Sequence, residues 1–238
     1  MFVPTLVTLN LVLAMQAAPS AEAAQPSAEA PAADVRAEAG PTDLERPADP
    51  VLFAHLSDEA VLARTVDAIA GVGTLRARFA QTSPTGTVSA GTVSMDRPGR
   101  LRFEYDAPST QDIVATGGLV YVHDTDLETT DSYPVGQTPL RFLLSEDIRA
   151  DDVVLTGVTR MPGEVAIALQ ATDDELAGEV ALVFAGTEDD LTLDRWAVVD
   201  PQGGVTVVQL MDVETDVKLS RRLFRIPETE RRFGNDRR

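Results

Sequence analysis

The chain of 238 residues contains no cysteine, and aromatic residues make up only 5% of it. It therefore forms no disulfide, has no thiolate for catalysis or metal binding, and has no thiol that could carry a lipid. Positive charge is also scarce, since 20 lysines and arginines stand against 38 aspartates and glutamates, for a formal net charge of −18. Nucleic acids and anionic membrane surfaces repel such a chain, so we expect neither as a direct partner.

Long apolar runs are missing except for a short one near the N-terminus, at residues 6–18. A membrane-spanning helix needs about 20 apolar residues, so this run is too short to cross a bilayer stably. The small residues that follow include Ala-Glu-Ala at 21–23, which suits a signal-peptidase site. We therefore predict a secretory signal peptide over residues 1–23, although no lysine or arginine precedes the run. The alternative is an ordinary helix that packs on the folded domain.

Alanine, proline and glutamate dominate the segment after this run, and large apolar side chains are rare there. Such a segment buries too little surface to offset the entropy that it would lose on ordering. We expect a disordered linker over residues 24–51, one folded domain over 52–227 and a short flexible basic tail over 228–238. The hydrophobic content of 44% is sufficient for a core.

Two segments have the apolar spacing of helices. Ser57 suits an N-cap, and Gly71 and Gly73 end the run that follows it. The apolar face of that first helix consists of Val61, Leu62, Thr65, Val66 and Ile69. Thr138 is predicted to cap a second, short helix that has Pro139 in its first turn. The apolar residues of the second helix are Leu140, Phe142, Leu143 and Leu144.

Most of the folded domain alternates apolar and polar residues, which is typical of half-buried strands. Strands are predicted at 75–79, 87–95, 100–106, 111–116, 119–124, 127–133, 152–160, 164–170, 179–186, 191–200 and 204–214. With so little helix between them, these strands indicate one large antiparallel sheet. A sheet of this size tends to curl into a barrel or half-barrel, and the two helices would cover its open side.

Catalytic motifs are not found in this sequence. It has no G-x-S-x-G, no H-E-x-x-H and no phosphate-binding glycine loop. His123 with Asp124 and Asp126 is a candidate metal cluster, but these residues fall at a predicted hairpin turn, where aspartate is favoured for backbone reasons. A pair of carboxylates of the glycosidase type stays open by residue type alone. We expect no enzyme activity, no cofactor and no metal.

The order and spacing of one set of residues resemble those of the periplasmic outer-membrane lipoprotein carrier proteins, the LolA family. The resemblance spans roughly residues 57–226. The residues that carry it are Arg97-Pro98, Leu101, Phe103, Tyr105, Pro108, Ile113-Val114, Gly117, Val120, Tyr121, Leu127-Glu128, Thr138-Pro139, Leu143-Leu144, the glycine-rich hairpin at 200–204 and Leu223-Phe224.

This resemblance implies a mainly β fold: an incomplete, half-open antiparallel barrel of about eleven strands with a lid of short α-helices. It implies a soluble periplasmic carrier that binds the acyl chains of lipoproteins and transports them from the inner to the outer membrane. The implied partners are acylated lipoproteins, an inner-membrane ATP-driven lipoprotein-releasing transporter and an outer-membrane receptor. We expect a monomer. The alternative function is a periplasmic sensor of lipid or lipoprotein that regulates a partner protein.

The resemblance also implies that Arg97 is the lid latch, bonded to backbone carbonyls of the lid helices, with Pro98 fixing its backbone. Helix C-termini leave carbonyls without intrahelical donors, and a guanidinium supplies five donors and stays charged. The alternative is that Arg97 ends an edge strand and forms an exposed ion pair with Asp96 or Glu104.

Acyl chains need an apolar lining inside the curved sheet. The candidate lining residues are Leu62, Val66, Ile69, Phe79, Phe103, Tyr105, Leu140, Phe142, Leu143 and Trp196. The alternative is that these side chains fill an ordinary core.

Overall fold

The computed structural model describes residues 49–146, 153–171 and 179–226. The predicted signal peptide, nearly all of the predicted linker and the basic tail lie outside these residues. The elements are α1 (Asp58–Gly71), β1 (Thr74–Thr82), β2 (Val88–Asp96), β3 (Arg100–Tyr105), β4 (Gln111–Thr116), β5 (Leu119–Asp124), β6 (Thr129–Pro134), η1 (Val135–Gln137), α2 (Arg141–Leu144), β7 (Val153–Met161), β8 (Glu164–Ala171), β9 (Glu179–Thr187), β10 (Asp190–Val199), β11 (Val205–Thr215) and η3 (Arg221–Phe224).

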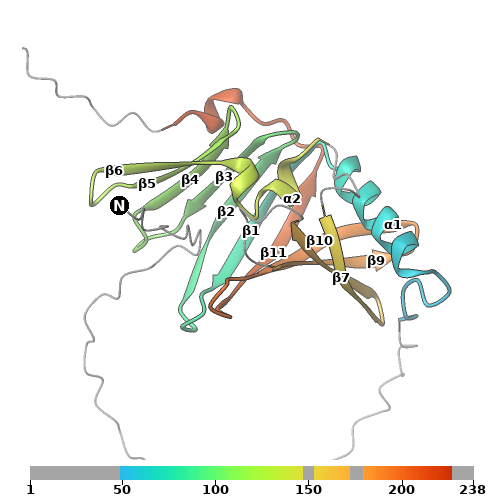
Figure 1. Ribbon diagram of the computed structural model, residues 1–238. Helices are drawn as coiled ribbons and strands as arrows, with labels where there is room; N and C mark the ends of the chain where they lie inside the picture. The colour runs from blue at the N-terminus through green and yellow to red at the C-terminus, as the bar shows by residue number, and fades with distance from the viewer. Residues whose placement is uncertain (1–48, 147–152, 172–178, 227–238) are drawn as a thin grey trace, which may run out of the picture.

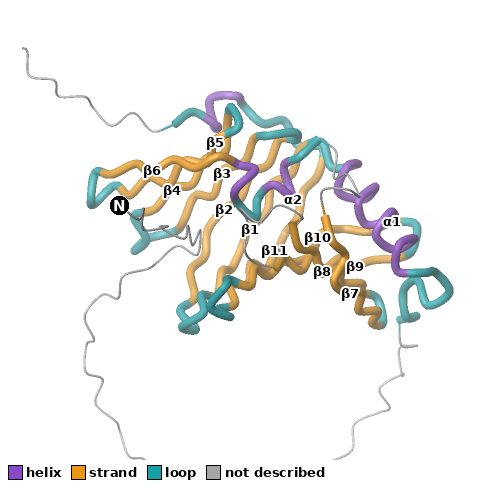
Figure 2. The backbone as a smooth tube through the Cα atoms, viewed as in Figure 1, coloured by secondary structure: helices purple, strands orange, loops and turns teal. Residues whose placement is uncertain are grey.

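All eleven strands form one antiparallel sheet in the order β6-β5-β4-β3-β2-β1-β11-β10-β9-β8-β7. Strand β1 pairs with both β2 and β11, so the first and last strands that the structure describes meet in the middle of the sheet. The sheet curls strongly but does not close, and β6 and β7 remain as its two edges (Figure 1, Figure 2). The predicted fold, a half-open antiparallel barrel with helices over its open side, is confirmed.

The alternation seen in the sequence decides which face of the sheet each side chain occupies. In β1, Leu75, Ala77 and Phe79 are buried on the concave face, whereas Arg76 and Arg78 alternate with them on the outer face. Gly91 of β2 lies opposite Phe79. A Cβ at position 91 would collide with the Glu104 carbonyl oxygen and lie 2.7 Å from the Phe79 ring, so only glycine leaves room for this ring.

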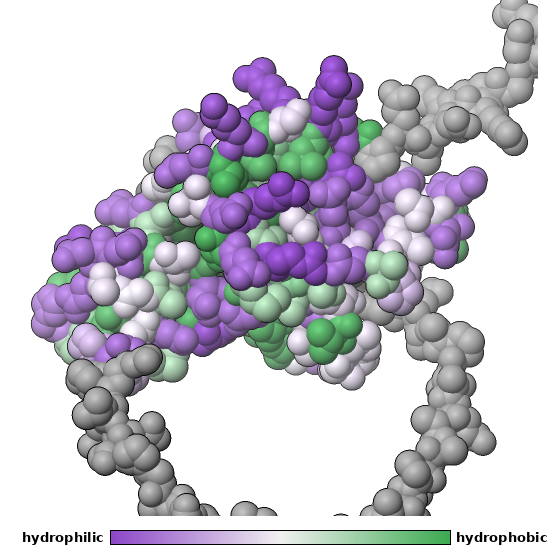
Figure 3. Space-filling view, turned by 180° about the vertical axis from the view of Figure 1, so that it is seen from behind, coloured by the Kyte–Doolittle hydropathy of each residue, from purple (hydrophilic) through white to green (hydrophobic). Residues whose placement is uncertain are grey.

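Charged side chains populate the outer face, where arginines and carboxylates of different strands form ion pairs. Arg102 of β3 binds both carboxylate oxygens of Asp112 on β4, at 3.0 and 2.7 Å. Arg195 of β10 binds Glu164 of β8 at 2.6 Å. Hydrophilic side chains accordingly dominate the rear view of the molecule (Figure 3).

The end of the described chain packs on this outer face. The Arg102 guanidinium donates a hydrogen bond to the Leu223 carbonyl at 2.9 Å, and η3 contacts β3 and β4. Phe224 of η3 and Val114 of β4 are both buried but do not belong to the main hydrophobic cluster. The start of the described chain is also held, because Val51 forms a β-bridge with Pro162.

The two helices differ in how well the sequence predicted them. Helix α1 begins as expected, since the Ser57 side chain accepts a hydrogen bond from the Ala60 N–H. The predicted N-cap of the second helix is wrong: the Thr138 hydroxyl donates to the Val135 carbonyl and caps nothing, and Leu140 is the N-cap of α2. The 3-10 turn η1 precedes Thr138 and supplies the carbonyl to which the Thr138 hydroxyl donates. Among the described residues, no helix is long and apolar enough to cross a membrane.

Candidate functional site

Helices α1 and α2 cover the concave face of the sheet (Figure 1). Helix α1 contacts β7 and β10, and it buries Val61, Thr65 and Ile69, which are spaced four residues apart on one side of the helix. Helix α2 buries Phe142 and Leu143 together with Leu144. Because the sheet is open on this side, these helices separate its apolar interior from water.

The C-terminal ends of both helices meet at Arg97, which follows β2. One terminal nitrogen of its guanidinium donates to the carbonyl of Ile69 in the last turn of α1, and the other donates to the carbonyl of Ser145, the C-cap of α2, at 2.6 Å. A cation at helix C-termini is also favoured by the helix dipole. One side chain therefore joins the two covering helices to the sheet.

Backbone hydrogen bonds reinforce this junction. The Arg97 N–H donates to the Gly73 carbonyl at 2.8 Å, just beyond α1. The Gly99 N–H donates to the Leu144 carbonyl at 3.0 Å, at the end of α2. We call residues 97–99 the Arg97 turn. It holds both helix ends through main-chain as well as side-chain donors.

Arg97 binds these carbonyls without a carboxylate partner among the described residues. Burial lowers the pKa of its guanidinium, and its Nε has no hydrogen-bond partner in the part of the chain that the structure describes. The alternative of an ion pair with Asp96 or Glu104 is wrong, because Asp96 pairs with Arg100 at 2.7 Å and Glu104 lies 3.6 Å from Arg102. Carbonyl partners hold a cation more weakly than a buried carboxylate does.

The other end of α1 is held by Arg160 of β7. Its Nε donates to the Phe53 carbonyl at 3.1 Å, and one terminal nitrogen donates to the Leu56 carbonyl at 3.0 Å and to the Asp58 carboxylate at 2.8 Å. This end thus has an ion pair in addition to two carbonyl bonds. Sequence analysis missed Arg160, whose only signal is its polar position in an alternating strand.

Two apolar cavities lie beneath the helices. The smaller has about 240 Å³ of space, part of it open to solvent, and its lining consists of Leu75, Val93, Met95, Leu101, Leu143, Leu193, Trp196 and Leu210. The larger has about 500 Å³, part of it open to solvent, and its lining consists of Gln81, Phe103, Tyr105, Ile113, Pro139, Leu140, Trp196, Val198, Thr206 and Val208. Trp196 lines both cavities and therefore stands between them.

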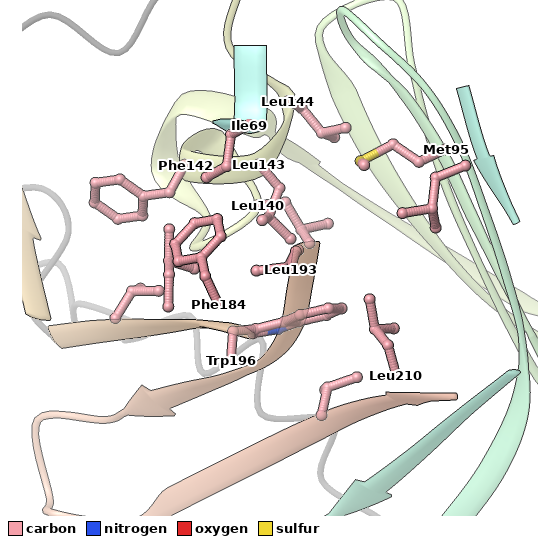
Figure 4. Close-up of a cluster of buried hydrophobic side chains, with 14 of the residues drawn as sticks. Ile69, Met95, Leu140, Phe142, Leu143, Leu144, Phe184, Leu193, Trp196 and Leu210 are labelled. Atoms are coloured by element: carbon pink, nitrogen blue, oxygen red, sulfur yellow. The ribbon is translucent and has the colours of Figure 1, made fainter. Parts of the chain in front are cut away.

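Side chains of the helices fill much of the interior. Figure 4 shows Ile69, Leu140 and Leu143 gathered above Phe184, Leu193 and Trp196, with the Phe142 ring pointing to the left of them. All of these residues belong to one buried hydrophobic cluster. Displacing the helix side chains would open the space that they now occupy.

The predicted lining residues fall into three groups. Phe103, Tyr105, Leu140, Leu143 and Trp196 line the cavities. Ile69, Phe79 and Phe142 are buried in the cluster but border neither cavity, and Leu62 packs against the cluster while partly buried. Val66 is half-buried and is not part of the cluster.

Phe79 packs behind two of the residues that line the larger cavity. Its ring meets those of Phe103 and Tyr105 edge to face, with centroids 5.0 and 5.1 Å away. Such contacts fix the orientation of the two rings that line the larger cavity. Gln81 and Thr206, which also line this cavity, were missed by sequence analysis because the lining was expected to be wholly apolar. Their signal was the period of two, which places both on the concave face.

Polar side chains away from the cavities form hydrogen bonds with backbone groups. Asp124 accepts hydrogen bonds from the N–H groups of Asp126 and Leu127 and from the Thr110 hydroxyl, and these bonds lower its pKa, the Leu127 N–H most strongly. His123 Nδ1 lies 3.0 Å from the Thr129 carbonyl oxygen. Within the described ranges, no group of three or more His, Asp or Glu side chains is arranged to hold a metal ion.

Comparisons with known proteins find a matching family model and similar sequences. Residues 70–227 match the family model described as outer membrane lipoprotein carrier protein LolA. The chain is 40% identical over 92 residues to the outer-membrane lipoprotein carrier protein of Methylibium petroleiphilum, covering 35% of this chain and 45% of that protein. It is 36% identical over 104 residues to the carrier protein of Pseudomonas paraeruginosa, covering 40% of this chain and 50% of that protein.

The aligned part thus spans about half the length of the curated relatives. Among solved structures, a LolA superfamily protein from Nitrosomonas europaea aligns with a TM-score of 0.45 and 12% identity, over 72% of this chain and 98% of that chain.

Proposed function

Because the chain belongs to the LolA family of outer membrane lipoprotein carrier proteins, we propose that it carries lipoproteins across the periplasm with their acyl chains enclosed beneath α1 and α2. It receives them from an ATP-driven transporter of the inner membrane and delivers them to the outer membrane or to a receptor there. Members of this family are carriers rather than enzymes, and binding and release are the chemistry that the site requires.

This proposal rests on the apolar interior that lies beneath α1 and α2, which are held at their ends. Each methylene removed from water contributes about 0.8 kcal/mol, so the lipid part of a lipoprotein does not cross an aqueous compartment without a shield. The buried cluster under α1 and α2 consists of aliphatic and aromatic side chains. Acyl chains would replace the helix side chains there with little change in the apolar area exposed to water.

Arg97 is the proposed latch of this cover. In the closed state it bonds the carbonyls of Ile69 and Ser145. When acyl chains enter, α1 and α2 move outward and those bonds break. The closed, empty state then competes with the cargo for the interior, which allows release at the destination.

The test is to purify the protein from the periplasm and to identify bound species by mass spectrometry. We expect triacylated or diacylated proteins in stoichiometric association. An outer-face variant such as Met211→Ala, whose side chain is 42% exposed, serves as the matched control and should retain the same species. Recovery of a partner protein without any lipidated species would contradict the carrier proposal and would favour a sensor that regulates that partner.

A further inference from the structure

One end of the larger cavity is polar, although the rest of its lining is apolar. Gln81 of β1, Tyr105 of β3 and Thr206 of β11 all face it. In the β1–β11 register Gln81 lies opposite Val208, so Thr206 is its diagonal neighbour on the same face of the sheet. Diagonal neighbours of this kind are about 7–8 Å apart, within reach of one small polar group.

Gln81 is oriented by Tyr105. The Tyr105 hydroxyl donates to the Gln81 side-chain oxygen at 2.9 Å. Burial raises the pKa of Tyr105, so the phenol keeps the proton that this bond needs. With its oxygen engaged, Gln81 has its amide N–H groups left to offer a ligand as donors.

Thr206 has a hydroxyl without a partner. Its side chain is only 8% exposed, it lines the cavity, and its oxygen has no hydrogen-bond partner among the described residues. A buried hydroxyl that makes no hydrogen bond destabilises a fold. Valine has nearly the same shape, so an ordinary core position would not need the hydroxyl.

The ligand group that fits this end of the cavity accepts hydrogen bonds and is uncharged. The Gln81 amide and the Thr206 hydroxyl can both donate, and no charged side chain among the described residues lines the cavity. A carboxylate would lose its hydration here without a counter-charge, which is strongly unfavourable. A carbonyl oxygen attached to a hydrocarbon chain meets both requirements, and the ester that joins an acyl chain to glycerol supplies one.

We propose that Gln81 and Thr206 bind the ester carbonyl of an acyl chain, so that the carrier recognises acyl-glycerol esters and not hydrocarbon alone. This inference rests on the proposed carrier function. The apolar part of the cavity, from Phe103 to Val208, holds the adjoining methylenes, while the polar end sets how far the chain enters. Trp196 and the smaller cavity beyond it receive the rest of the chain.

The experiment compares two lipopeptides with the same peptide and the same chain length. One carries a diacylglyceryl group with ester carbonyls, and the other carries a dialkylglyceryl group with ether oxygens. For the wild-type protein we expect the ester lipopeptide to bind roughly three- to tenfold more tightly, as for one or two neutral hydrogen bonds. In Thr206→Val this ratio should fall toward one, with affinity for the ether lipopeptide unchanged. Tyr105→Phe, which frees Gln81, should lower the ratio partially.

The control is Thr92→Val, which removes a hydroxyl that accepts from Arg78 on the outer face and should preserve the wild-type ratio. The melting temperature gives a second readout, because Thr206→Val removes an unpaired buried hydroxyl and should raise it. Equal binding of both lipopeptides by the wild type, or a full ester preference in Thr206→Val, would overturn the inference and leave the carrier function standing. Failure of the wild type to bind either lipopeptide would instead overturn the carrier function.

Discussion

Arg97 and Ile69 lie 28 positions apart in the sequence, and a hydrogen bond from the guanidinium to the main-chain carbonyl joins them. The same guanidinium binds the Ser145 carbonyl. The cover is therefore attached at this end through backbone atoms, which depend on helix position and not on side-chain identity. At its other end α1 has a true ion pair, between Arg160 and Asp58. This asymmetry predicts that the cover opens at the Arg97 end and pivots at the Arg160 end.

Replacing Arg97 with leucine should favour the open state of the cover. Losing two charge-assisted hydrogen bonds lowers the free energy of opening by about 1–3 kcal/mol, a factor of roughly 5 to 150. Amide hydrogen exchange in the last turn of α1 should accelerate by such a factor. Cargo should be retained but transferred poorly, because the closed state that displaces it is weakened.

Arg78→Leu is the matched control, since Arg78 pairs with Asp106 on the outer face and contacts neither helix. It should leave hydrogen exchange in α1 and cargo transfer unchanged. Normal transfer by Arg97→Leu would count against the latch.

Replacing Arg160 with leucine should release the opposite end of α1. The Phe53 and Leu56 carbonyls and the Asp58 carboxylate would lose their shared donor. Because the binding of these groups fixes the chain that enters α1, we expect a lower melting temperature and faster exchange over residues 53–60. The last turn of α1 should stay protected by Arg97. Uniform acceleration along all of α1 would show that the helix moves as one body without a pivot.

Replacing Gly91 with alanine should destabilise the fold. The new Cβ would collide with the Glu104 carbonyl oxygen and the Phe79 ring, and overpacking of this kind costs about 1–3 kcal/mol. Gly157→Ala is the control, because its nearest neighbour would be the Ala168 Cβ at 4.0 Å. Chemical denaturation measures both. Equal stability of the two variants would mean that Phe79 does not press on β2 as described.

Trp196 is the only tryptophan in the chain and provides an optical signal. It is 6% exposed and lines both cavities, so its emission in the empty protein should be that of a buried indole. Binding of an acylated lipopeptide should change the emission intensity, and the same peptide without acyl chains should not. An acyl ligand that binds without altering the emission would place its chains away from this residue.

The fold was readily predicted because the residue pattern within each strand is enough to identify it. The period of two in β1 through β11 marks each strand and its inward face, and glycine or proline marks most turns. The predicted details were wrong where a side chain has two possible hydrogen-bond partners. The Thr138 hydroxyl, for example, binds the Val135 carbonyl of η1 and does not cap α2. Strand β6 starts two residues later than expected, at Thr129, because Asp124 binds the N–H groups of Asp126 and Leu127 and lengthens the turn.

The site was less accessible from the sequence. The resemblance of the Arg97-Pro98 region to a known family supplied the expectation of a latch, whereas the residues alone favoured an exposed ion pair. Arg160 and Thr206 could not be distinguished from other polar residues in strands, since their partners lie far away in the sequence or are absent from the described residues. Helical spacing suggested Val66 as a lining residue, but the burial of Thr65 next to it shows that the inward stripe of α1 is narrower.

The measurement that tests the account most directly is photo-crosslinking to a lipoprotein whose acyl chains are labelled. A photoreactive side chain replaces Val198, which is half-buried and lines the larger cavity, or Met211, which is exposed on the outer face of β11. We predict crosslinks from position 198 to the labelled acyl chains and none from position 211. Crosslinks from position 211 with none from position 198 would contradict an acyl-chain site inside the curved sheet.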